Sequence, residues 1–449
     1  MTDSAIKKYL NERIPRYTSY PTAPHFSAAV GPQAYEGWLR AVPEDARLSL
    51  YLHVPFCETL CWYCGCHTSI TRHRGPIEKY VGLLLREVDH VADVIGGHRA
   101  AHIHFGGGTP AIVGPELFGS IMTRLRQRFD FEPDAEVAIE IDPRRLTPEM
   151  ADALGRNGVT RASLGVQTFD PAVQEAVARV QSLETTQACA KLLRGAGIKD
   201  LNVDLLYGLI HETVESCMDT VAGALSLSPA RLAVFGYAHV PGMMKHQKVL
   251  DESALPTSDA RLTQERAIGD AMLQAGYQRI GLDHYARPDD PMAVAQRTGQ
   301  LRRNFQGYTD DPADALIGMG ASSIGQLPQG YVQNAHHIKD WGDRIEAGQL
   351  ATVRGVAFTP EDVLRSDIIE RLMCDLKVDV PAAIRQHGFN PHCLDNEMAN
   401  LRTLVADGLA EVDGGVITVP ESTRNLVRRV ASVFDAYLDP AAGRHAVAV

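Results

Sequence analysis

Short β-rich runs alternate with amphipathic stretches from residue 48 to residue 240, and this alternation is the strongest constraint on the fold. The stretches at 148–158 and 183–197 carry apolar residues at helical spacing and end in a glycine, as helices do. Such alternation is typical of βαβ units and a parallel sheet, and six units predict an α/β fold with an incomplete (β/α)6, TIM-like barrel. The six expected strands are Leu48–Val54, Ala101–Pro110, Ala135–Asp142, Thr160–Phe169, Lys199–Leu209 and Ala230–Val240.

Unusual residues fall where these strands end. Four cysteines follow the first expected strand, and the glycine run Gly106–Pro110 closes the second. In or after the next three strands stand Glu140, Gln167, Asp204 and Tyr207. Because parallel barrels carry their chemistry at the carboxyl ends of the strands, we expect these residues to share one site.

The pattern changes on either side of the barrel. We expect an N-terminal arm packing on the barrel (1–47), the barrel with an extension (48–355) and a mainly helical, winged-helix-like C-terminal domain (356–449). In the last part, helical patterns are followed by a hairpin with a Gly414–Gly415 turn and by a final helix over 423–438. The segment 441–449 is expected to fray.

The charge balance restricts the partners. The 449 residues carry 44 Lys and Arg against 55 Asp and Glu, a formal net charge of −11, which argues against a nucleic-acid or membrane-surface partner and against DNA binding by the C-terminal domain. No apolar run approaches the roughly 18 residues of a membrane-spanning helix, and the N-terminus has no secretory-signal pattern. We therefore expect a cytoplasmic protein without membrane insertion.

In the cytoplasm thiols stay reduced, so clustered cysteines indicate metal binding or catalysis rather than disulfides. Half of the eight cysteines lie in CETLCWYCGC, at Cys57, Cys61, Cys64 and Cys66. The others are expected to be buried small apolar residues. These scattered cysteines are Cys189, Cys217, Cys374 and Cys393.

The C-x3-C-x2-C-x-C spacing allows two metal sites. Structural zinc takes four soft ligands, but usually from two separated knuckles rather than one loop. A [4Fe–4S] cluster normally takes four thiolates. With Cys57, Cys61 and Cys64 wrapping three corners of the cube, one iron stays open for a substrate group. Cys66 is poorly placed to reach the fourth corner, and spacing alone leaves zinc and iron–sulfur both open.

A C-x3-C-x2-C loop that closes the first strand of a partial barrel resembles that of the radical S-adenosylmethionine (SAM) superfamily. In that superfamily the open iron chelates the amino and carboxylate groups of SAM. Tyr63, the aromatic residue before the third cysteine, fits the resemblance. So does the glycine run at the end of the second strand, because a backbone without side chains can approach a ligand closely.

Across almost the whole chain, ten motifs in order resemble the family of oxygen-independent coproporphyrinogen III oxidases. They are RYTSYPTAPHF (Arg16–Phe26), YLHVPFCETLCWYCGC, HFGGGTP, EIDPR, GVQTF, DLLYGL, FGYAHVP, GLDHYARPDD, RRNFQGYT and GMGASSIG. One departure is LIHET (Leu209–Thr213), where the family usually has a proline after the leucine. The departure affects a loop after the fifth strand and no motif residue.

The resemblance implies a [4Fe–4S] cluster on Cys57, Cys61 and Cys64 and two bound SAM molecules. Positions that match those serving the first SAM are Tyr51, Gly107, Glu140 and Ile324. Positions that match those serving the second are Tyr63, Gly108, Thr109, Gln167, Arg179, Asp204 and Ala238. Cys66, Tyr51 and Glu140 are the implied catalytic residues. Taken singly, Glu140 and Asp204 would more often be paired carboxylates of a barrel, and Arg179 a helix-surface charge.

The family reaction converts two propionates of coproporphyrinogen III to vinyl groups, giving protoporphyrinogen IX in haem biosynthesis, by means of a 5′-deoxyadenosyl radical. It implies an electron donor of the flavodoxin or ferredoxin type and an electron acceptor that the sequence does not identify. We expect a monomer. Since the substrate has four propionates, the site should present cations, and the candidates are Arg16, Arg287, Arg302 and Arg303. Paired arginines, however, are often solvent-exposed.

Three other functions compete with this one: that of a haem-chaperone relative, that of a methyl-transferring relative and that of a zinc-stabilised scaffold. The chaperone relative lacks the fourth cysteine and the RYTSYPT arm, and both are present here as Cys66 and Arg16–Thr22. We expect stoichiometric zinc without sulfide if the chain is a scaffold, and four irons with four sulfides if it is a radical SAM enzyme.

Overall fold

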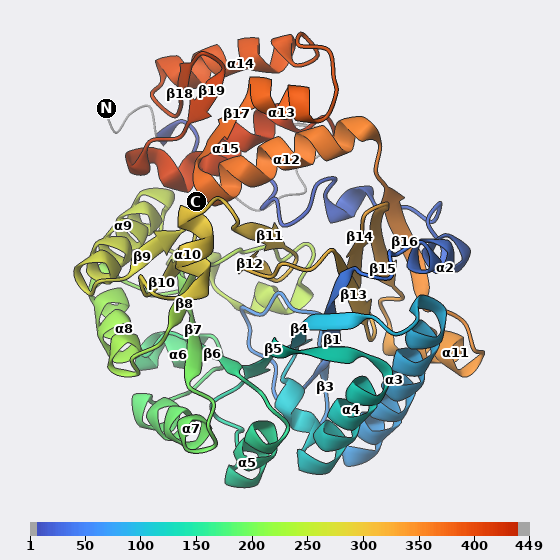
Figure 1. Ribbon diagram of the computed structural model, residues 1–449. Helices are drawn as coiled ribbons and strands as arrows, with labels where there is room; N and C mark the ends of the chain where they lie inside the picture. Colours follow the sequence, from blue (N-terminus) through green and yellow to red (C-terminus); the bar gives the residue numbers. More distant parts are fainter. Residues whose placement is uncertain (1–6, 439–449) are drawn as a thin grey trace.

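The computed structural model describes residues 7–438, so the expected fraying of 441–449 lies outside the described residues. One 12-stranded sheet forms the frame of the molecule (Figure 1). From edge to edge its strands are β16 (Thr352–Ala357), β15 (Gly330–Asn334), β14 (Ile324–Leu327), β13 (Ala315–Met319), β1 (Arg47–Val54), β4 (Arg99–Gly107), β5 (Asp130–Ile141), β6 (Arg161–Gln167), β7 (Asp200–Tyr207), β8 (Arg231–Gly236), β10 (His284–Ala286) and β9 (Gln278–Ile280).

All six predicted strands are confirmed as β1, β4, β5, β6, β7 and β8, which pair in parallel in this order. A seventh parallel strand, β13, pairs with the other edge of β1 and was not predicted. All five of its residues are buried, so it lacks an alternating pattern. Glycines at 318 and 320 further weaken the strand signal. The remaining strands extend the sheet in antiparallel pairs.

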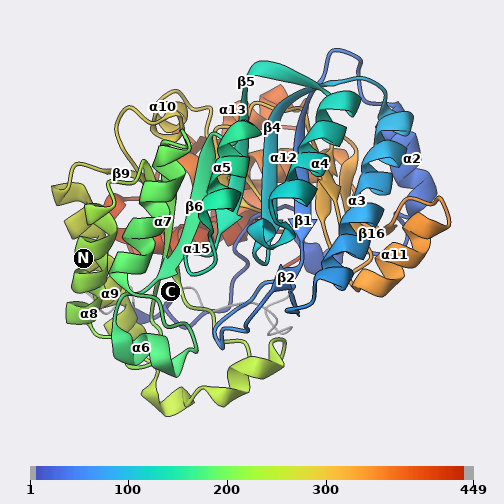
Figure 2. The same ribbon diagram turned by 90° about the horizontal axis from the view of Figure 1, so that it is seen from below.

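Helices cover the outer face of the parallel strands (Figure 2). Several of them start at a side chain that caps the helix, such as Thr147, Ser182 and Thr213. The helices between strands are α3 (Arg74–Ile95), α4 (Pro115–Arg128), α5 (Pro148–Arg156), α6 (Pro171–Ala176), α7 (Leu183–Gly195), α8 (Val214–Ser226) and α9 (Ser258–Gln274). Smaller elements of the arm, loops and extension are η1 (Ala23–His25), α2 (Pro32–Arg40), β2 (Phe56–Cys57), β3 (Ser69–Ile70), η2 (Pro110–Val113), η3 (Lys245–Val249), η4 (Glu252–Ala254), α10 (Pro291–Arg297), β11 (Arg302–Asn304), β12 (Gly307–Thr309) and α11 (Ile338–Glu346).

The C-terminal unit lies above the barrel in Figure 1. Its elements are α12 (Pro360–Asp375), β17 (Lys377–Asp379), α13 (Val380–Gln386), α14 (Asp395–Ala406), β18 (Glu411–Asp413), β19 (Val416–Thr418), η5 (Glu421–Leu426), α15 (Val427–Ala431) and η6 (Ser432–Phe434). The predicted hairpin turn is confirmed, since Gly414 and Gly415 both have positive φ between β18 and β19. The single helix expected over 423–438 is wrong, because α15 is flanked by the short 3-10 helices η5 and η6.

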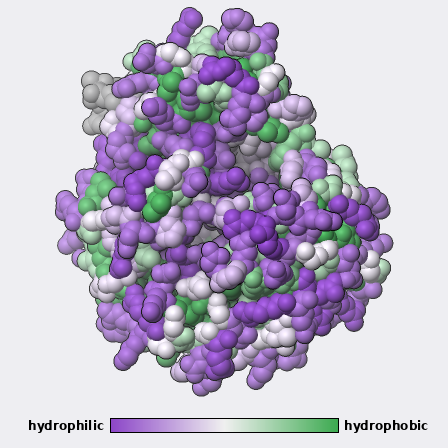
Figure 3. All heavy atoms as spheres, in the orientation of Figure 1, coloured by the Kyte–Doolittle hydropathy of each residue, from purple (hydrophilic) through white to green (hydrophobic). Residues whose placement is uncertain are grey.

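Two large hydrophobic cores divide the arm. Tyr9, Ile14, Tyr17 and other apolar residues of the arm pack in one core with the C-terminal unit. The side chains on α2 instead join the core of the barrel. The arm is therefore divided: residues 9–20 contribute to the core of the C-terminal unit, whereas Val30 and α2 contribute to the core of the barrel, and Phe26 stacks on Tyr331 of β15. The face in Figure 3 is mostly hydrophilic.

The scattered cysteines are buried at Cys189, Cys217 and Cys374, as predicted. The prediction for Cys393 is wrong: it is exposed, in the loop between α13 and α14. Within residues 7–438, no helix is both long and apolar enough to cross a membrane.

Candidate active site

The four clustered cysteines lie on one loop at the carboxyl end of β1. The short strands β2 and β3 pair in parallel and hold the two ends of the loop together. Cys61 is buried, Cys57 and Cys64 are partly buried, and Cys66 is exposed. The Cys66 backbone N–H donates to the Cys64 Sγ at 3.4 Å, so Cys66 supports this sulfur from outside the C-x3-C-x2-C triad.

Two guanidinium groups face the buried sulfur of the triad. Arg179 Nη1 lies 3.6 Å and Arg144 Nη2 3.8 Å from the Cys61 Sγ. Both arginines also pair with Asp142, at 3.6 and 2.7 Å. Burial would raise the pKa of Asp142, but these two cations hold it below its usual value. Cations beside a cysteine favour the thiolate, which is the form that binds metal.

The glycine run locks the cysteine loop onto β4. A Cβ on Gly108 would lie 2.5 Å from the Phe56 carbonyl oxygen, and one on Gly107 would lie 2.7 Å from the His53 ring. The Thr109 N–H donates to the Phe56 carbonyl at 2.7 Å, and its hydroxyl lies 3.4 Å from the Cys57 Sγ. The space that side chains would fill at 107 and 108 is thus taken by protein atoms, in contrast to the close approach of a ligand suggested by sequence.

The two predicted carboxylates, Glu140 and Asp204, are both hydrogen-bonded within the protein. Glu140 Oε2 accepts from the Gly107 N–H at 3.0 Å, yet 38% of its side chain stays exposed. Asp204 accepts from the Ser163 hydroxyl and the Asn202 amide, both at 2.8 Å. Burial raises the pKa of Asp204 to about 6. Each carboxylate is therefore oriented by the barrel before any ligand binds.

The predicted site residues largely gather around one pocket beside the cysteine loop. Its lining includes Cys57, Cys61, Cys64, Cys66, Tyr63, Gly107, Gly108, Thr109, Glu140, Gln167, Arg179 and Asp204. Tyr51, Ile324 and Ala238 do not line it. The Tyr51 ring stacks on His104 behind Glu140, Ile324 begins β14, and Ala238 lines a second pocket. Gln167, at the end of β6, has a φ of 71°, an uncommon backbone conformation for a residue with a side chain.

The chemistry of the donor set fits an iron–sulfur cluster better than one metal ion. In the described part of the chain, no group of three or more His, Cys, Asp or Glu residues is placed to hold a single ion. A cube instead takes each thiolate at a separate iron, so its ligands need not converge. The three thiols line one pocket, and the two guanidiniums beside Cys61 offset negative charge there.

The second pocket gathers four arginines between the barrel, the arm and the C-terminal unit. Predicted Arg16 and Arg303 line it, together with Arg261 of α9 and Arg428 of α15. Arg16 donates to the Gly236 carbonyl at 3.2 Å, at the carboxyl end of β8. Burial, followed by the nearby Arg16 charge, lowers the pKa of Arg428 to about 10. We call this group the arginine pocket.

Two arginines of the pocket have buried guanidinium nitrogen atoms that lack a hydrogen-bond partner within the protein: Nε of Arg261, and both Nε and Nη1 of Arg303. Asp283 and Glu265 are the acidic residues of the lining. Although burial raises the pKa of Asp283, its bond to His284 and the Arg303 charge bring it down to about 2. Burying a hydrogen-bond donor without a partner costs free energy, and an anion could supply the partners, so this pocket is suited to bind an anion.

The two pockets are joined by the barrel interior. A central cavity shares Glu140, Ser163 and Asp204 with the cysteine pocket and Phe235 with the arginine pocket. A ligand whose carboxylates occupy the arginine pocket can therefore extend toward the cysteine loop.

The other two predicted arginines do not join the pocket. Arg287 donates to the Ser228 carbonyl at 2.9 Å, beside the amino end of β8 and so opposite the cysteine loop. Arg302 is exposed in a cleft lined by Asp289, Asp310 and Glu370. Since successive residues of a strand point to opposite sides, only Arg303 of the RR pair faces the pocket.

Sequence reasoning missed Arg144, Arg261 and Arg428. Arg144 stands in the EIDPR motif, and that motif was the available signal. No local signal existed for Arg261 or Arg428. Each is one of two arginines on its helix, and only the fold brings them to the arm.

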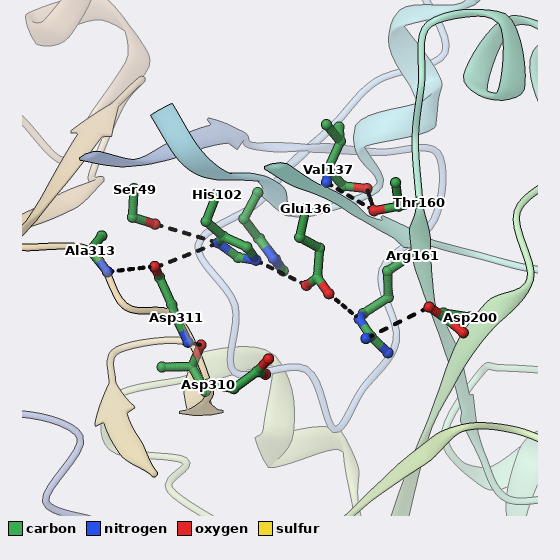
Figure 4. A network of polar contacts seen from close by, with 12 residues as sticks. Ser49, His102, Glu136, Val137, Thr160, Arg161, Asp200, Asp310, Asp311 and Ala313 are labelled. Atoms are coloured by element: carbon green, nitrogen blue, oxygen red, sulfur yellow. Dashed lines mark hydrogen bonds and ion pairs between the residues drawn. The ribbon is translucent and has the colours of Figure 1, made fainter. Parts of the chain in front are cut away.

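A different cluster of charges fills the amino end of the barrel (Figure 4). The Glu136 carboxylate binds His102 Nε2 at 3.0 Å and Arg161 Nε at 2.9 Å. His102 Nδ1 lies 3.7 Å from Asp311, and Arg231 pairs with Asp290 at 2.7 Å. We call this group the amino-end network; in it every named cation has an acidic partner.

Comparisons with known proteins agree with this site. The model of the Radical SAM superfamily matches residues 51–222, which include the cysteine loop, the glycine run and Asp204. The fold and the cysteine loop therefore define a radical SAM protein.

More specific relatives cover nearly the whole chain. It is 52% identical over 442 residues to the oxygen-independent coproporphyrinogen III oxidase of Bradyrhizobium diazoefficiens, with 98% of each chain covered. It is 43% identical over 438 residues to that of Paracoccus denitrificans, with 97% of each covered. The solved structure of the Escherichia coli coproporphyrinogen III oxidase, described as a radical SAM enzyme, superposes with a TM-score of 0.91 at 37% identity, over 97% of this chain and 99% of that one. The chain belongs to the family of oxygen-independent coproporphyrinogen III oxidases, which are radical SAM enzymes.

Proposed function

We propose that this enzyme oxidatively decarboxylates two propionate side chains of coproporphyrinogen III to vinyl groups without oxygen, giving protoporphyrinogen IX. The single observation that carries the substrate assignment is the arginine pocket. Four guanidiniums face one cavity that opens to the barrel interior, and those of Arg261 and Arg303 have buried nitrogen atoms without a hydrogen-bond partner. A substrate with four carboxylates supplies the missing acceptors, and arginine suits carboxylates through paired hydrogen bonds.

When bound, a [4Fe–4S] cluster and SAM supply the radical chemistry, in the form of a 5′-deoxyadenosyl radical. Cys57, Cys61 and Cys64 would hold the cluster, because their thiols line one pocket beside the cations of Arg144 and Arg179. The protein itself positions both ligands and excludes water from them. The buried residues Cys61 and Thr109 contribute to that exclusion.

Two SAM molecules are part of the proposal. For the first, the partly exposed Glu140 carboxylate offers lone pairs to an ammonium group. The other residues proposed for it are Tyr51, Gly107 and Ile324. For the second, the Arg179 Nε is buried without a partner and can bind a carboxylate. The other groups proposed for the second molecule are Tyr63, Gly108, Thr109, Gln167, Asp204 and Ala238.

Cys66 is proposed to act in the reaction without binding the cluster. Its backbone already supports the Cys64 sulfur, and its thiol lines the cysteine pocket together with Glu140. In anaerobically reconstituted protein, Cys57→Ser should lose the cluster absorbance, whereas Cys66→Ser should keep four irons and four sulfides and lose turnover. Loss of the cluster in both variants would contradict this division of roles.

The test of the function is anaerobic turnover. The reconstituted protein is incubated with coproporphyrinogen III, SAM, a reductant and cell extract, and products are separated by chromatography. We expect protoporphyrinogen IX with cleavage of SAM. Binding of a porphyrin without any vinyl product, which is the behaviour of a chaperone, would overturn the proposal.

A further inference from the structure

Two arginines face the Cys61 sulfur, and the proposed function gives a ligand to only one of them. The Nε atom of Arg179 is buried without a partner and is proposed to bind the carboxylate of the second SAM molecule. Arg144 lies at a similar distance from the same sulfur, but its guanidinium is held by its own loop. What Arg144 does for the site is therefore a separate question.

Arg144 is fixed by Asp142, which stands two residues earlier in the EIDPR motif. The Arg144 backbone N–H donates to Asp142 Oδ1 at 3.1 Å, and its Nε donates to the same oxygen atom at 2.9 Å. Its Nη2 donates to the other oxygen atom, Oδ2, at 2.7 Å. Two parallel bonds from a guanidinium to one carboxylate fix the plane and the direction of the arginine side chain.

The nitrogen atom that bonds to Asp142 also faces the cysteine. Arg144 Nη2 lies 3.8 Å from the Cys61 Sγ. Only 15% of the Arg144 side chain and 11% of the Asp142 side chain are exposed, and Cys61 is buried. All three residues line the cysteine pocket. The guanidinium and the carboxylate therefore both act on this sulfur in surroundings that water screens only weakly.

A positive and a negative charge beside a cluster ligand have opposite effects on electron uptake. A [4Fe–4S] cluster becomes more negative when it is reduced, and its potential depends on nearby charge, on hydrogen bonds to the sulfur atoms and on exposure to solvent. The Arg144 guanidinium should stabilise the reduced state, both by its charge and by an N–H directed at the sulfur. The Asp142 carboxylate should oppose reduction.

We propose that Arg144 and Asp142 are positioning residues that set the reduction potential of a [4Fe–4S] cluster bound through Cys61. The inference rests on the proposed function, which places the cluster on the three cysteines. Arg144 favours the uptake of one electron, whereas Asp142 limits this effect while it holds the guanidinium against the sulfur. In this step a reductant loses one electron and the oxidised cluster gains it, with no bond or proton exchanged.

The test is a redox titration of the reconstituted protein with dithionite and mediators, without SAM, followed by the EPR signal of the reduced cluster. Arg144→Met removes the cation and leaves the carboxylate of Asp142 uncompensated. We expect the equilibrium constant for one-electron reduction to fall about tenfold, which lowers the potential by about 59 mV. Asp142→Asn keeps an oxygen atom that accepts from Arg144 and should raise the constant by about the same factor.

Arg145→Met is the matched control. Arg145 is the next residue along the chain, and it pairs with Glu58 of the cysteine loop at 2.9 Å, but 41% of its side chain is exposed. Water and salt screen an exposed charge, so this variant should keep the wild-type potential. The double variant Asp142→Asn/Arg144→Met loses one charge of each sign, and its potential should lie between those of the two single variants.

The sign of the shift decides between tuning and a purely structural role. Shifts in the same direction in the two single variants, or no shift in either, would overturn the proposal. So would an unchanged potential with weaker SAM binding in Arg144→Met, because that result places Arg144 on SAM. Iron and sulfide are counted in every variant. If Arg144→Met holds no cluster, Asp142→Asn decides alone, since only a raised potential agrees with the proposal.

The same proteins separate this inference from the proposed function. If the two potentials shift in opposite directions but no protoporphyrinogen forms in the turnover assay, the proposed function fails and the tuning pair stands. If wild type forms protoporphyrinogen and neither substitution shifts the potential, the tuning pair fails and the proposed function stands.

Discussion

The arginine pocket and the amino-end network both bury several charges against the same barrel, but they balance those charges differently. In the amino-end network, Arg161 and Arg231 each have a carboxylate within 2.9 Å, and His102 has two acidic neighbours. In the arginine pocket, no carboxylate of the described residues lies within salt-bridge distance of Arg16, Arg261 or Arg303. The charges of the amino-end network are compensated within the folded chain, whereas Arg16, Arg261 and Arg303 gain an acidic partner only from an anionic ligand.

This difference predicts that mutations in the amino-end network change the stability of the fold, whereas mutations in the arginine pocket change substrate binding. Burying a charge costs free energy unless a partner compensates it. Removing a member of the amino-end network should therefore uncover its partner and destabilise the fold. Removing a cation of the arginine pocket should relieve repulsion and leave the fold intact, at the cost of substrate binding.

The largest effect is expected in the arginine pocket. Arg303→Met removes the charge and keeps most of the volume. We expect kcat/KM for coproporphyrinogen III to fall by about 30-fold or more, which corresponds to a loss of at least about 2 kcal/mol for a buried charged contact. Thermal unfolding should not shift to lower temperature. The neighbour Arg302→Met is the matched control and should keep wild-type kinetics, since Arg302 faces the outer cleft.

The second effect concerns stability. Glu136→Gln leaves Arg161 and His102 without their shared carboxylate. Breaking a buried pair typically costs about 3–5 kcal/mol, so denaturant unfolding should show a loss of this order. Glu36→Gln, which breaks the exposed pair with Arg40, should cost less than about 1 kcal/mol. Equal losses in the two variants would remove the distinction between the network and a surface pair.

The third effect is a pH dependence of the amino-end network. Burial alone would raise the pKa of Glu136. The hydrogen bond from His102 and the charge of Arg161 instead hold this pKa far below its usual value. A carboxyl with a lowered pKa contributes stability above its unfolded value of about 4.5 and loses it as the pH falls. The free energy of unfolding should therefore drop between pH 5 and pH 3 more steeply in wild type than in Glu136→Gln. Parallel curves would show that Glu136 is not charge-paired.

His102 should act in the opposite direction. Despite burial, its bond to Glu136 raises its pKa above the usual value. Its contribution is present below pH 6.5 and should disappear as the pH rises through the raised value. His102→Gln should flatten the unfolding curve on the alkaline side, by roughly 1.4 kcal/mol for each pKa unit of the shift. A curve unchanged above pH 6.5 would contradict the pairing.

The sequence predicted those parts of the fold and of the site that depend on residues close together along the chain. The six strands, the cysteine loop and the residues at strand ends follow from periodicity and spacing, and the structure gathers Glu140, Gln167 and Asp204 around the loop as expected. β13 was missed because a short, fully buried strand has no alternation to detect. Arg261 and Arg428 were missed because their role depends on the packing of α9 and α15 against the arm, more than 160 residues apart along the chain. Arg287 and Arg302 were named from their motifs, and the fold turns them elsewhere.

The central claim is that the arginine pocket binds substrate carboxylates through Arg16, Arg261 and Arg303, and porphyrin affinity tests it most directly. Fluorescence quenching can measure the binding of coproporphyrin III, with four carboxylates, and protoporphyrin IX, with two, to wild type, Arg303→Met and Arg302→Met. The account predicts tighter binding of coproporphyrin III by wild type and by Arg302→Met, and a much smaller preference in Arg303→Met. Equal affinity for both porphyrins in wild type, or the same preference in all three proteins, would contradict it.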